Sequence, residues 1–278
     1  MDYEIRLLQF NDGDKSLQKV VDLQNLVYKG KHSFTIKGFK KWYLENPMGR
    51  VISFNAFYGE ELVAHYACIP YKMEIEGREV LGLFDMATVT HPDHRGKGLF
   101  TKLARITYDY AKEQGFEFVI GIANANSFPG YMKHFPFTFV GQLDVKIGYG
   151  RDIVPVENKT FYACWDKESL AWRTKINTYQ KGDDCIIGQR GCFVRTFMGH
   201  FDNNLLTNVS LPQIKEGSGI KPMLYVGLGA KIKGLYFTVP KYIKHSPFNL
   251  IFLDLTNGKL PIMTRDNVFF QLFDFDVA

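Results

Sequence analysis

The most informative part of this 278-residue chain is the segment HPDHRGKGLF at residues 91–100. The apolar run at residues 81–90 is typical of a buried strand, and apolar residues recur at helical spacing after the segment. Glycines let a backbone approach a ligand closely, and a helix N-terminus adds partial positive charge. With the charges of Arg95 and Lys97, the segment predicts a pyrophosphate site. A basic surface loop is the alternative, so a second element is needed.

The glycine spacing excludes two common phosphate-binding motifs. A P-loop needs Gly-x4-Gly-Lys-Ser/Thr, and a dinucleotide fingerprint needs a third glycine with an acidic residue after the next strand. The segment instead resembles the acyl-CoA loop of the GCN5-related N-acetyltransferase (GNAT) superfamily, Arg/Gln-x-x-Gly-x-Gly/Ala, at Arg95, Gly98 and position 100. Phe100 departs from this pattern, because a small residue is usual there. The resemblance implies contacts with acyl-CoA by Arg95, Gly96, Lys97, Gly98, Leu99 and Phe100.

A second element of the same family lies downstream. The apolar strand expected at residues 116–123 is followed by Asn124, and Tyr131 comes seven residues later. GNAT enzymes have an Asn and a Tyr at this spacing, the latter within Tyr-x-Lys-x-Gly-Phe. Lys133 keeps its place, whereas residues 135–137 (FPF) replace the closing Gly-Phe with one extra residue. The resemblance spans about residues 1–145 and implies further acyl-CoA contacts by Thr88, Val89, Thr90, Asn124 and Asn126.

The rest of the first half is consistent with a GNAT fold. The pattern predicts strands at residues 3–10, 51–58, 62–73 and 80–90, and helices at residues 17–27 and 36–45. Ser16 is the expected N-cap of the first helix, and Pro47 follows the second. This order predicts an α/β (α+β) fold: a mixed, mostly antiparallel sheet flanked by helices.

The second half predicts a smaller α/β domain, so we divide the chain into residues 1–147 and 148–278. The pattern indicates a linker at 151–158, a helix near 167–177, a polar loop at 203–219, and strands at 185–187, 192–198, 223–228, 235–239, 249–255 and 269–275. A helix followed by strand, turn and strand repeats the order of the first half. This suggests a degenerate second GNAT-like copy without an acyl-CoA loop; the glycines at 227 and 229 are expected to form a tight turn.

Composition narrows the choice of partners and compartment. The formal net charge of +5 suits anionic ligands, but no basic stripe interleaved with aromatic residues indicates nucleic-acid binding. No apolar run is long enough for membrane insertion, and the first residues do not resemble a signal peptide. The cysteines at 68, 164, 185 and 192 form no Cys-x-x-Cys pair. We therefore expect a cytoplasmic protein with reduced thiols.

The resemblance also implies catalytic roles. By family analogy, Tyr131 would protonate the leaving sulfur and the pantetheine arm would pair with residues 88–90 between two diverging strands; the alternative for Tyr131 is an aromatic packed on the sheet. Asp85 lies between Phe84 and Met86, where GNAT enzymes often carry an acid. It is either the general base or a structural hydrogen-bond acceptor, and a water chain could replace it for a weakly basic amine. No metal is predicted: His91 and His94 lack a third ligand and are expected to be solvated.

The acceptor is the least determined part. The two-domain architecture, the stretch NSFPGY at residues 126–131 and the terminal FDFD resemble N-acyltransferases of nucleotide-linked (dTDP- or UDP-) amino sugars in bacterial surface polysaccharide (O-antigen) biosynthesis. The acyl group is then acetyl or longer, such as 3-hydroxybutanoyl. Candidate acceptor residues are Trp165, Trp172, Arg173 and Tyr179, for which core packing is the alternative. Two other functions remain open: acetylation of a peptide, polyamine or antibiotic amine, and non-catalytic acyl-CoA binding. The sequence leaves the oligomeric state open.

Overall fold

The protein's computed structural model describes residues 2–30, 33–150, 152–175, 179–190, 194–207, 209–214, 222–240 and 247–275. Several positions discussed above lie outside the described residues: Cys192, the first residue of the expected linker, the end of the expected helix at 176–177, and parts of the loop at 203–219. No helix in the described ranges has both the length and the apolar character needed to cross a membrane.

The first half follows the predicted order of elements. Its elements are β1 (Glu4–Leu7), α1 (Lys15–Val27), α2 (Ile36–Tyr43), β2 (Ile52–Tyr58), β3 (Glu61–Ile75), β4 (Arg78–Thr90), the short 3-10 helix η1 (Pro92–His94), α3 (Leu99–Glu113), β5 (Phe118–Ala123), α4 (Phe128–His134) and β6 (Thr138–Gln142). The predicted meander of three strands, the helix after the glycine loop and the following strand are all confirmed.

The second half is richer in short strands. It contains β8 (Ile153–Pro155), β9 (Phe161–Ala163), α5 (Lys167–Thr174), β10 (Tyr179–Lys181), β11 (Cys185–Arg190), β12 (Val194–His200), α6 (Asn203–Thr207), β13 (Met223–Leu228), β14 (Ala230–Ile232), β15 (Leu235–Thr238), β16 (Asn249–Asp254), β17 (Val268–Gln271) and the 3-10 helix η3 (Leu272–Asp274). Strand β7 (Asp144–Tyr149) follows β6 at the end of the first half and leads into the second. Two expectations were wrong: the expected linker includes β8, and the loop at 203–219 includes α6. Gly229, with φ of +74°, makes the expected turn between β13 and β14.

Helix starts follow local capping chemistry. The predicted N-cap Ser16 was wrong: α1 begins at Lys15 after Asp14, and the Ser16 hydroxyl donates to Oδ2 of Asp12 at 2.6 Å. The same Asp12 oxygen accepts from the Ser16 amide at 3.1 Å, so Asp12 and not Ser16 satisfies one of the first N–H groups of the helix. Thr35 is a true N-cap of α2, because its hydroxyl accepts from the Gly38 amide at 3.1 Å.

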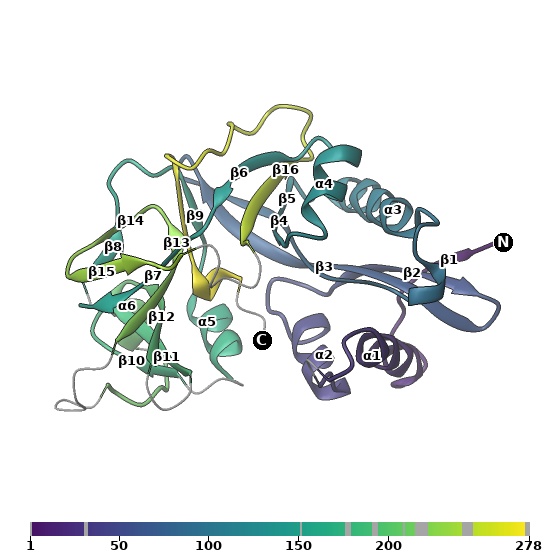
Figure 1. The fold of residues 1–278 in the computed structure, drawn as a ribbon, viewed down its shortest axis with the longest axis horizontal. Coiled ribbons are helices and arrows are strands. Elements are labelled where there is room, and N and C mark those ends of the chain that lie inside the picture. The colour runs from purple at the N-terminus through teal and green to yellow at the C-terminus, as the bar shows by residue number, and fades with distance from the viewer. Residues whose placement is uncertain are drawn as a thin grey trace.

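The sheet of the first half is mixed, as predicted. β1, β2, β3 and β4 pair antiparallel in sequence order, and β4 pairs parallel with β5. Helices α1 and α2 cover one face of this sheet, and α3 and α4 cover the other (Figure 1). β16, from the end of the chain, lies antiparallel between β5 and β6. The C-terminal half therefore completes the sheet that carries the glycine loop.

The second half repeats this strand pattern in reduced form. β10, β11 and β12 pair antiparallel, and β12 pairs parallel with β13. β7, which enters from the first half, lies between β13 and β15 just as β16 lies between β5 and β6. The two halves thus exchange one strand each, an arrangement that fits a degenerate second GNAT-like copy. The predicted boundary at 147/148 falls inside β7; the division into two folding units stays a prediction.

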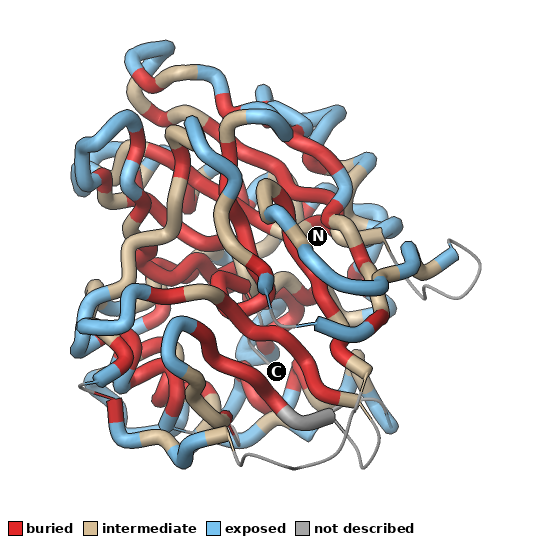
Figure 2. The backbone as a smooth tube through the Cα atoms, turned by 90° about the vertical axis from the view of Figure 1, so that its left-hand side faces the viewer, coloured by how far each residue is buried: buried red, intermediate tan, exposed pale blue. Residues whose placement is uncertain are grey.

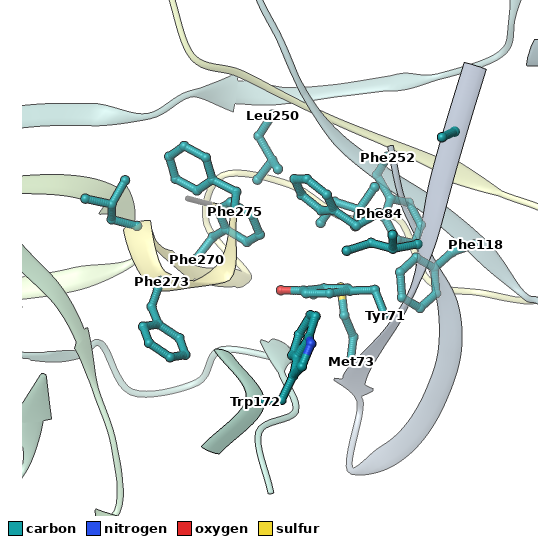
Figure 3. Close-up of a cluster of buried hydrophobic side chains, with 14 of the residues drawn as sticks. Tyr71, Met73, Phe84, Phe118, Trp172, Leu250, Phe252, Phe270, Phe273 and Phe275 are labelled. Atoms are coloured by element: carbon teal, nitrogen blue, oxygen red, sulfur yellow. The ribbon is translucent and has the colours of Figure 1, made fainter. Parts of the chain in front are cut away.

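One apolar core extends through both halves. The ring of Phe252 on β16 stacks on Phe118 of β5 with centroids 5.4 Å apart, and it contacts Phe161 of β9 at 5.8 Å. Figure 3 shows this cluster with rings from β4, β5, α5, β16 and β17 around Tyr71 and Met73. Figure 2 shows buried residues along the segments inside the molecule and exposed residues mostly at its periphery. Because these rings bury their surface against each other, the halves share their main hydrophobic stabilisation.

Helices α2 and α5 contact each other and so join the two halves. The Trp42 and Trp172 rings meet edge to face at 5.0 Å, and the Trp172 indole donates to the Lys41 carbonyl at 2.9 Å. In return, Nζ of Lys41 donates to the Arg173 carbonyl at 3.2 Å. Each helix therefore supplies a hydrogen-bond partner for a polar group of the other, next to the contact between the two tryptophan rings.

Candidate active site

The site begins where β4 and β5 part. Their parallel pairing runs from Leu83 opposite Val119 to Asp85 opposite Gly121 and ends there. On its other side β4 carries a bulge, since Ala87 and Asp85 face consecutive residues of β3 and leave Met86 as the extra residue. A bulge bends and twists its strand, so residues 86–90 turn away from β5. The predicted divergence of these two strands is thus present.

A cleft of about 1350 Å³ opens at this divergence. It is bordered by α1, α2, β4, the glycine loop, β5 and α4, and by Ile251 of the exchanged strand β16. Pockets for one small ligand usually occupy about 300–1000 Å³. The cleft is therefore large enough for a donor and an acceptor together.

The glycine loop lies at one end of the cleft. Gly96 and Gly98 have φ of +72° and +73°, and Gly98 caps α3. These left-handed conformations favour glycine, and the start of α3, whose first N–H groups have no partner within the helix, borders the cleft. The Arg95 guanidinium donates to the Thr90 carbonyl at 3.3 Å, so the basic side chain stays beside the loop. This end can hold an anionic group.

Nearly all the residues predicted to contact acyl-CoA border the cleft. They are Thr88, Val89, Thr90, Arg95, Gly96, Gly98, Leu99, Phe100, Asn124 and Asn126. Lys97 is not among the described lining residues, and its Nζ donates to the Asp93 carbonyl at 3.1 Å. Oδ1 of Asn124 accepts from the amides of Asn126 and Ser127 at 2.9 and 3.0 Å, so this side chain shapes the turn into α4.

Phe100, the departure from the family pattern, is matched by a glycine. Its ring packs edge to face on Tyr131 at 5.1 Å. A Cβ at position 130 would lie 3.2 Å from Cε1 of Phe100. Gly130 therefore provides the room that the larger ring needs, and the ring in turn supports Tyr131 from the side of the loop.

The loop histidines differ from each other, and the prediction that both are solvated was wrong for one. His94 is buried, and its Nδ1 lies 2.9 Å from the hydroxyl of Tyr3. It anchors the loop to the first strand region rather than facing solvent. Across the part of the chain that the structure describes, no group of three or more His, Cys, Asp or Glu side chains could hold a metal ion.

Asp85 and Tyr131 meet at the floor of the cleft. The Tyr131 hydroxyl donates to Oδ2 of Asp85 at 2.6 Å. Burial raises the pKa of Asp85 to about 6, although hydrogen bonds from Tyr131, Tyr66 and Tyr108 pull it down. Asp85 still borders the cleft and is half-buried as a whole residue, so a ligand in the cleft can approach it. Burial also raises the pKa of Tyr131 well above its usual value, so this phenol stays protonated.

Sequence reasoning missed two members of this cluster, Tyr66 on β3 and Tyr108 on α3. The Tyr66 hydroxyl donates to Asp85 and also contacts the Tyr108 hydroxyl, which lies 3.4 Å from Oδ2 of Asp85. One signal was available: Tyr108 follows Ala104 by four residues on the buried face of α3. A buried phenol needs a partner for its hydroxyl, so such a position indicates a polar cluster.

The four residues predicted for the acceptor lie elsewhere. The Trp165 indole donates to Asp274 at 2.9 Å, the Arg173 guanidinium donates to the Phe273 carbonyl, and Tyr179 packs on the ring of Phe273. Trp172 lies in the α2–α5 contact. None of the four is among the described residues that line the cleft. Their surroundings are those of core and junction residues.

Aromatic residues of the first half instead form the wall opposite β4. Tyr28, Phe34, Phe39 and Trp42 line the cleft there. Lys41 lies beside them, and burial, together with the nearby Arg173, lowers its pKa to about 8. Asp85 is the one carboxylate among the described lining residues. This half of the cleft is therefore aromatic and without the acidic groups that a polycation would need.

Comparison with known proteins agrees with this geometry. Residues 6–137 match the family model described as an acetyltransferase (GNAT) domain. A comparison with curated proteins found no match in sequence.

Three solved structures share the fold over most of the chain. A conserved protein of unknown function from Enterococcus faecalis V583, described as a probable N-acyltransferase, has a TM-score of 0.61 at 10% identity, covering 92% of this chain and 73% of that one. A GCN5-related N-acetyltransferase from Kribbella flavida gives 0.60 at 11%, covering 90% and 71%. Another from Anabaena variabilis gives 0.58 at 11%, covering 91% and 74%. At these identities the likeness establishes the fold alone.

Proposed function

We propose that this acyl-CoA-dependent N-acyltransferase, whose residues 6–137 form a GNAT acetyltransferase domain, acylates the amine of a nucleotide-linked amino sugar. The observation that carries the proposal is the cleft itself. An anion-binding turn lies at one end, an acid–base pair lies at its floor, and an aromatic wall with a single carboxylate nearby lies opposite. Each of these parts has a distinct task in acyl transfer.

The donor end fits the diphosphate of acyl-CoA. The amides at the start of α3 and the Arg95 guanidinium supply hydrogen-bond donors and positive charge. The edges of residues 88–90, which β5 no longer pairs, offer backbone groups to an extended pantetheine arm. The thioester supplies the acyl group, acetyl or a longer hydroxyacyl such as 3-hydroxybutanoyl.

Asp85 and Tyr131 then divide the proton transfers. Asp85 takes a proton from the acceptor amine, and the amine nitrogen forms its bond to the acyl carbon as the bond from carbon to sulfur breaks. Once Asp85 is protonated, the Tyr131 hydroxyl can donate its proton to the leaving sulfur. The proton on Asp85 then passes to the Tyr131 oxygen along their hydrogen bond, which restores both the carboxylate and the phenol. A thiol has a pKa of about 8.5 and a phenol of about 10, so this transfer is feasible when it accompanies bond cleavage.

The acceptor wall supports an amine that is not part of a polycation. Aminoglycosides and polyamines carry several positive charges, and a site for them needs several carboxylates. The described lining supplies Asp85 alone, which the mechanism already uses. Tyr28, Phe34 and Trp42 offer flat faces for a nucleobase, and Lys41 offers positive charge for a phosphate.

The proposal includes a cytoplasmic location. The cysteines at 68 and 164 are free thiols, which is consistent with a reducing compartment. A role in bacterial surface polysaccharide (O-antigen) biosynthesis follows from the same substrate class.

The acceptor is tested by direct product detection. The protein is incubated with acetyl-CoA or 3-hydroxybutanoyl-CoA and, separately, with dTDP- and UDP-linked amino sugars, polyamines, aminoglycosides and short peptides. Mass spectrometry should show an acylated nucleotide sugar and no acylated polycation. An acylated aminoglycoside, polyamine or peptide as the main product would refute the proposed acceptor. Tyr131→Phe is the catalytic control and should remove most of the product without abolishing CoA binding.

A further inference from the structure

Three phenols surround one carboxylate in this protein. The hydroxyls of Tyr66, Tyr108 and Tyr131 all approach the same oxygen, Oδ2 of Asp85. The tyrosines come from three separate elements, β3, α3 and α4, and all are buried. Tyr131 has a role in the proposed reaction. Tyr66 and Tyr108 lie outside the described cleft lining and have none so far.

We propose that Tyr66, supported by Tyr108, is a positioning residue that keeps Asp85 ionised and turns its other oxygen, Oδ1, toward the acceptor amine. This inference depends on the proposed function, in which Asp85 is the base. Its basis is geometric: Oδ2 is occupied by hydroxyl donors from the protein, so Oδ1 is the oxygen left for the ligand. A carboxylate held in this way cannot rotate freely between its two oxygens.

The surroundings explain why such support is needed. Asp85 lies beside Phe84 and Met86 on β4, next to Gly121, where an added Cβ would lie only 3.2 Å from the Cβ of Asp85. This apolar and crowded environment favours the neutral acid, which cannot act as a base. Hydroxyl donors favour the charged form instead.

Among the described residues, the titratable side chains that face Asp85 come from three elements. β3 contributes Tyr66 and Cys68, α3 contributes Tyr108, and α4 contributes Tyr131. The neighbours on β5 and β16 do not titrate. Burial and the nearby carboxylate raise the pKa of Cys68 well above its usual value, so this thiol stays neutral. None of these groups is a cation, and the phenols therefore supply the main stabilisation of the carboxylate.

Tyr66 is coupled to Tyr108 through a direct contact between their hydroxyls. The Tyr108 ring is held by Phe135 and Phe137 at 5.3 and 5.9 Å. This aromatic contact fixes the second phenol, which in turn limits the rotation of the first hydroxyl. Removal of either hydroxyl should affect Asp85, with the larger effect from Tyr66 because it donates directly.

The test is a carboxyl titration that needs no acceptor. Carbon-13 NMR of the aspartate side-chain carboxyls in the full chain gives the midpoint for Asp85, which Asp85→Asn assigns by loss of its signal. Tyr66→Phe should raise this midpoint by about one pH unit, and Tyr108→Phe by less. Tyr71→Phe is the matched control, because it removes a buried hydroxyl on the same strand that has no hydrogen-bond partner in the structure. This variant should leave the midpoint unchanged.

The titration and the activity assay give separate outcomes. A midpoint that stays in place or falls in Tyr66→Phe overturns the inference; if that variant does not fold, the same criterion applies to Tyr108→Phe. The base assignment is judged separately. If Asp85→Asn keeps full transfer activity toward the acceptor found above, Asp85 is not the base and the proposed mechanism fails, whatever the titration shows. If Tyr66→Phe raises the midpoint and Asp85→Asn loses activity, the acidic limb of kcat/KM in Tyr66→Phe must shift to higher pH together with the NMR midpoint.

Discussion

Asp85 is a carboxyl group that the fold holds at a cost in stability. Its pKa is about 6 in the folded protein against 3.8 as the ordinary value, and burial is the cause. Between these two values the folded state keeps a proton that the unfolded state releases. Stability from this group is therefore present at low pH and is lost as pH rises through that window. Function and stability make opposite demands on this residue.

Asp85→Asn should make the protein more stable at neutral pH. The amide resembles the protonated acid, so the gain over the parent protein should be small in acid and grow by about 2 kcal/mol between about pH 4.5 and about pH 7.5. Chemical denaturation of both proteins at the two pH values measures this difference. A gain that shrinks as pH rises would contradict the burial of an ionised carboxylate here.

The same substitution should remove the base. General acid–base catalysis typically contributes about 10²- to 10⁴-fold, and a loss in this range is expected in kcat. In the parent protein kcat/KM should rise with pH through about 6, because Asp85 must be ionised to accept a proton. Steady-state kinetics across the pH range checks both. A pH profile with no such limb would show that another group, or water, accepts the proton.

Residue roles were only partly accessible from the sequence. Asp85 and Tyr131 could be named because a family motif places them, and their hydrogen bond fits the predicted acid–base roles, which stay predictions. Tyr66 and Tyr108 belong to no motif. They lie 42 positions apart in sequence and meet only because β3 and α3 pack together.

At the scale of elements, the glycine loop joins β4 to α3 with two residues in left-handed conformation. Neither Gly96 nor Gly98 has an atom within 4 Å of the position that a Cβ would take. Glycine is therefore required at these two positions because of the backbone conformation, and not because a side chain would clash. A side chain at either position would strain the turn and redirect the amides at the start of α3.

Gly98→Ala should raise KM for acetyl-CoA with little change in kcat. The left-handed conformation costs a non-glycine residue about 1 kcal/mol, and the loop relaxes away from it. Gly59→Ala is the matched control, because Gly59 has φ of +58° in the β2–β3 turn and also has open space around it. The control should lose similar stability and keep its KM. Equal KM values in both variants would argue against donor binding at the loop.

Elements were predicted well where a short-range signal exists. The meander, α3 and β5 follow from apolar runs bounded by glycine turns. The start of α1 was placed wrongly because Asp12, Asp14 and Ser16 are all capping residue types within one turn. Local chemistry alone does not choose among three such candidates.

At the scale of the whole molecule, the two halves complete each other. β16 fills the place between β5 and β6, and β7 fills the place between β13 and β15. A sheet that lacks its inner strand exposes unpaired backbone groups on both sides of the gap. The first half is therefore expected to depend on the last part of the chain.

A fragment of residues 1–143 should not fold alone. It keeps the glycine loop and α3 but loses β16, together with the Phe252 ring that stacks on Phe118. Circular dichroism and amide exchange should show a largely unprotected β5. Co-expression with residues 144–278 is the control and should restore a folded complex. A native-like spectrum from the first fragment by itself would show an independent folding unit instead.

Trp172→Ala should destabilise the protein by about 3–5 kcal/mol, because it removes a buried ring and the hydrogen bond to the Lys41 carbonyl at the junction of the halves. Chemical denaturation measures the effect. Phe237→Ala serves as the comparison, since that ring is 63% exposed and its loss should change stability by no more than about 0.5 kcal/mol. Similar values for the two variants would mean that the junction contributes little.

The location of the aromatic wall of the cleft shows the limit of composition as a guide. Trp165, Trp172, Arg173 and Tyr179 are aromatic or basic and belong to the half without the glycine loop, so they were natural candidates for the acceptor. In the structure they pack around η3 and α2. Aromatic side chains serve cores and binding walls equally well, and only packing distinguishes the two uses.

By itself, the amino-acid sequence determined the GNAT-like fold of the first half, the glycine loop and the order of its strands and helices. These features depend on neighbours within a few residues: turn-forming glycines, a helix N-terminus and alternating apolar positions. Tertiary structure alone decided the strand exchange, the tyrosines around Asp85 and the wall of the cleft. Those features bring together residues tens to hundreds of positions apart, and their energies arise from burial and hydrogen bonds that exist only after the chain has packed.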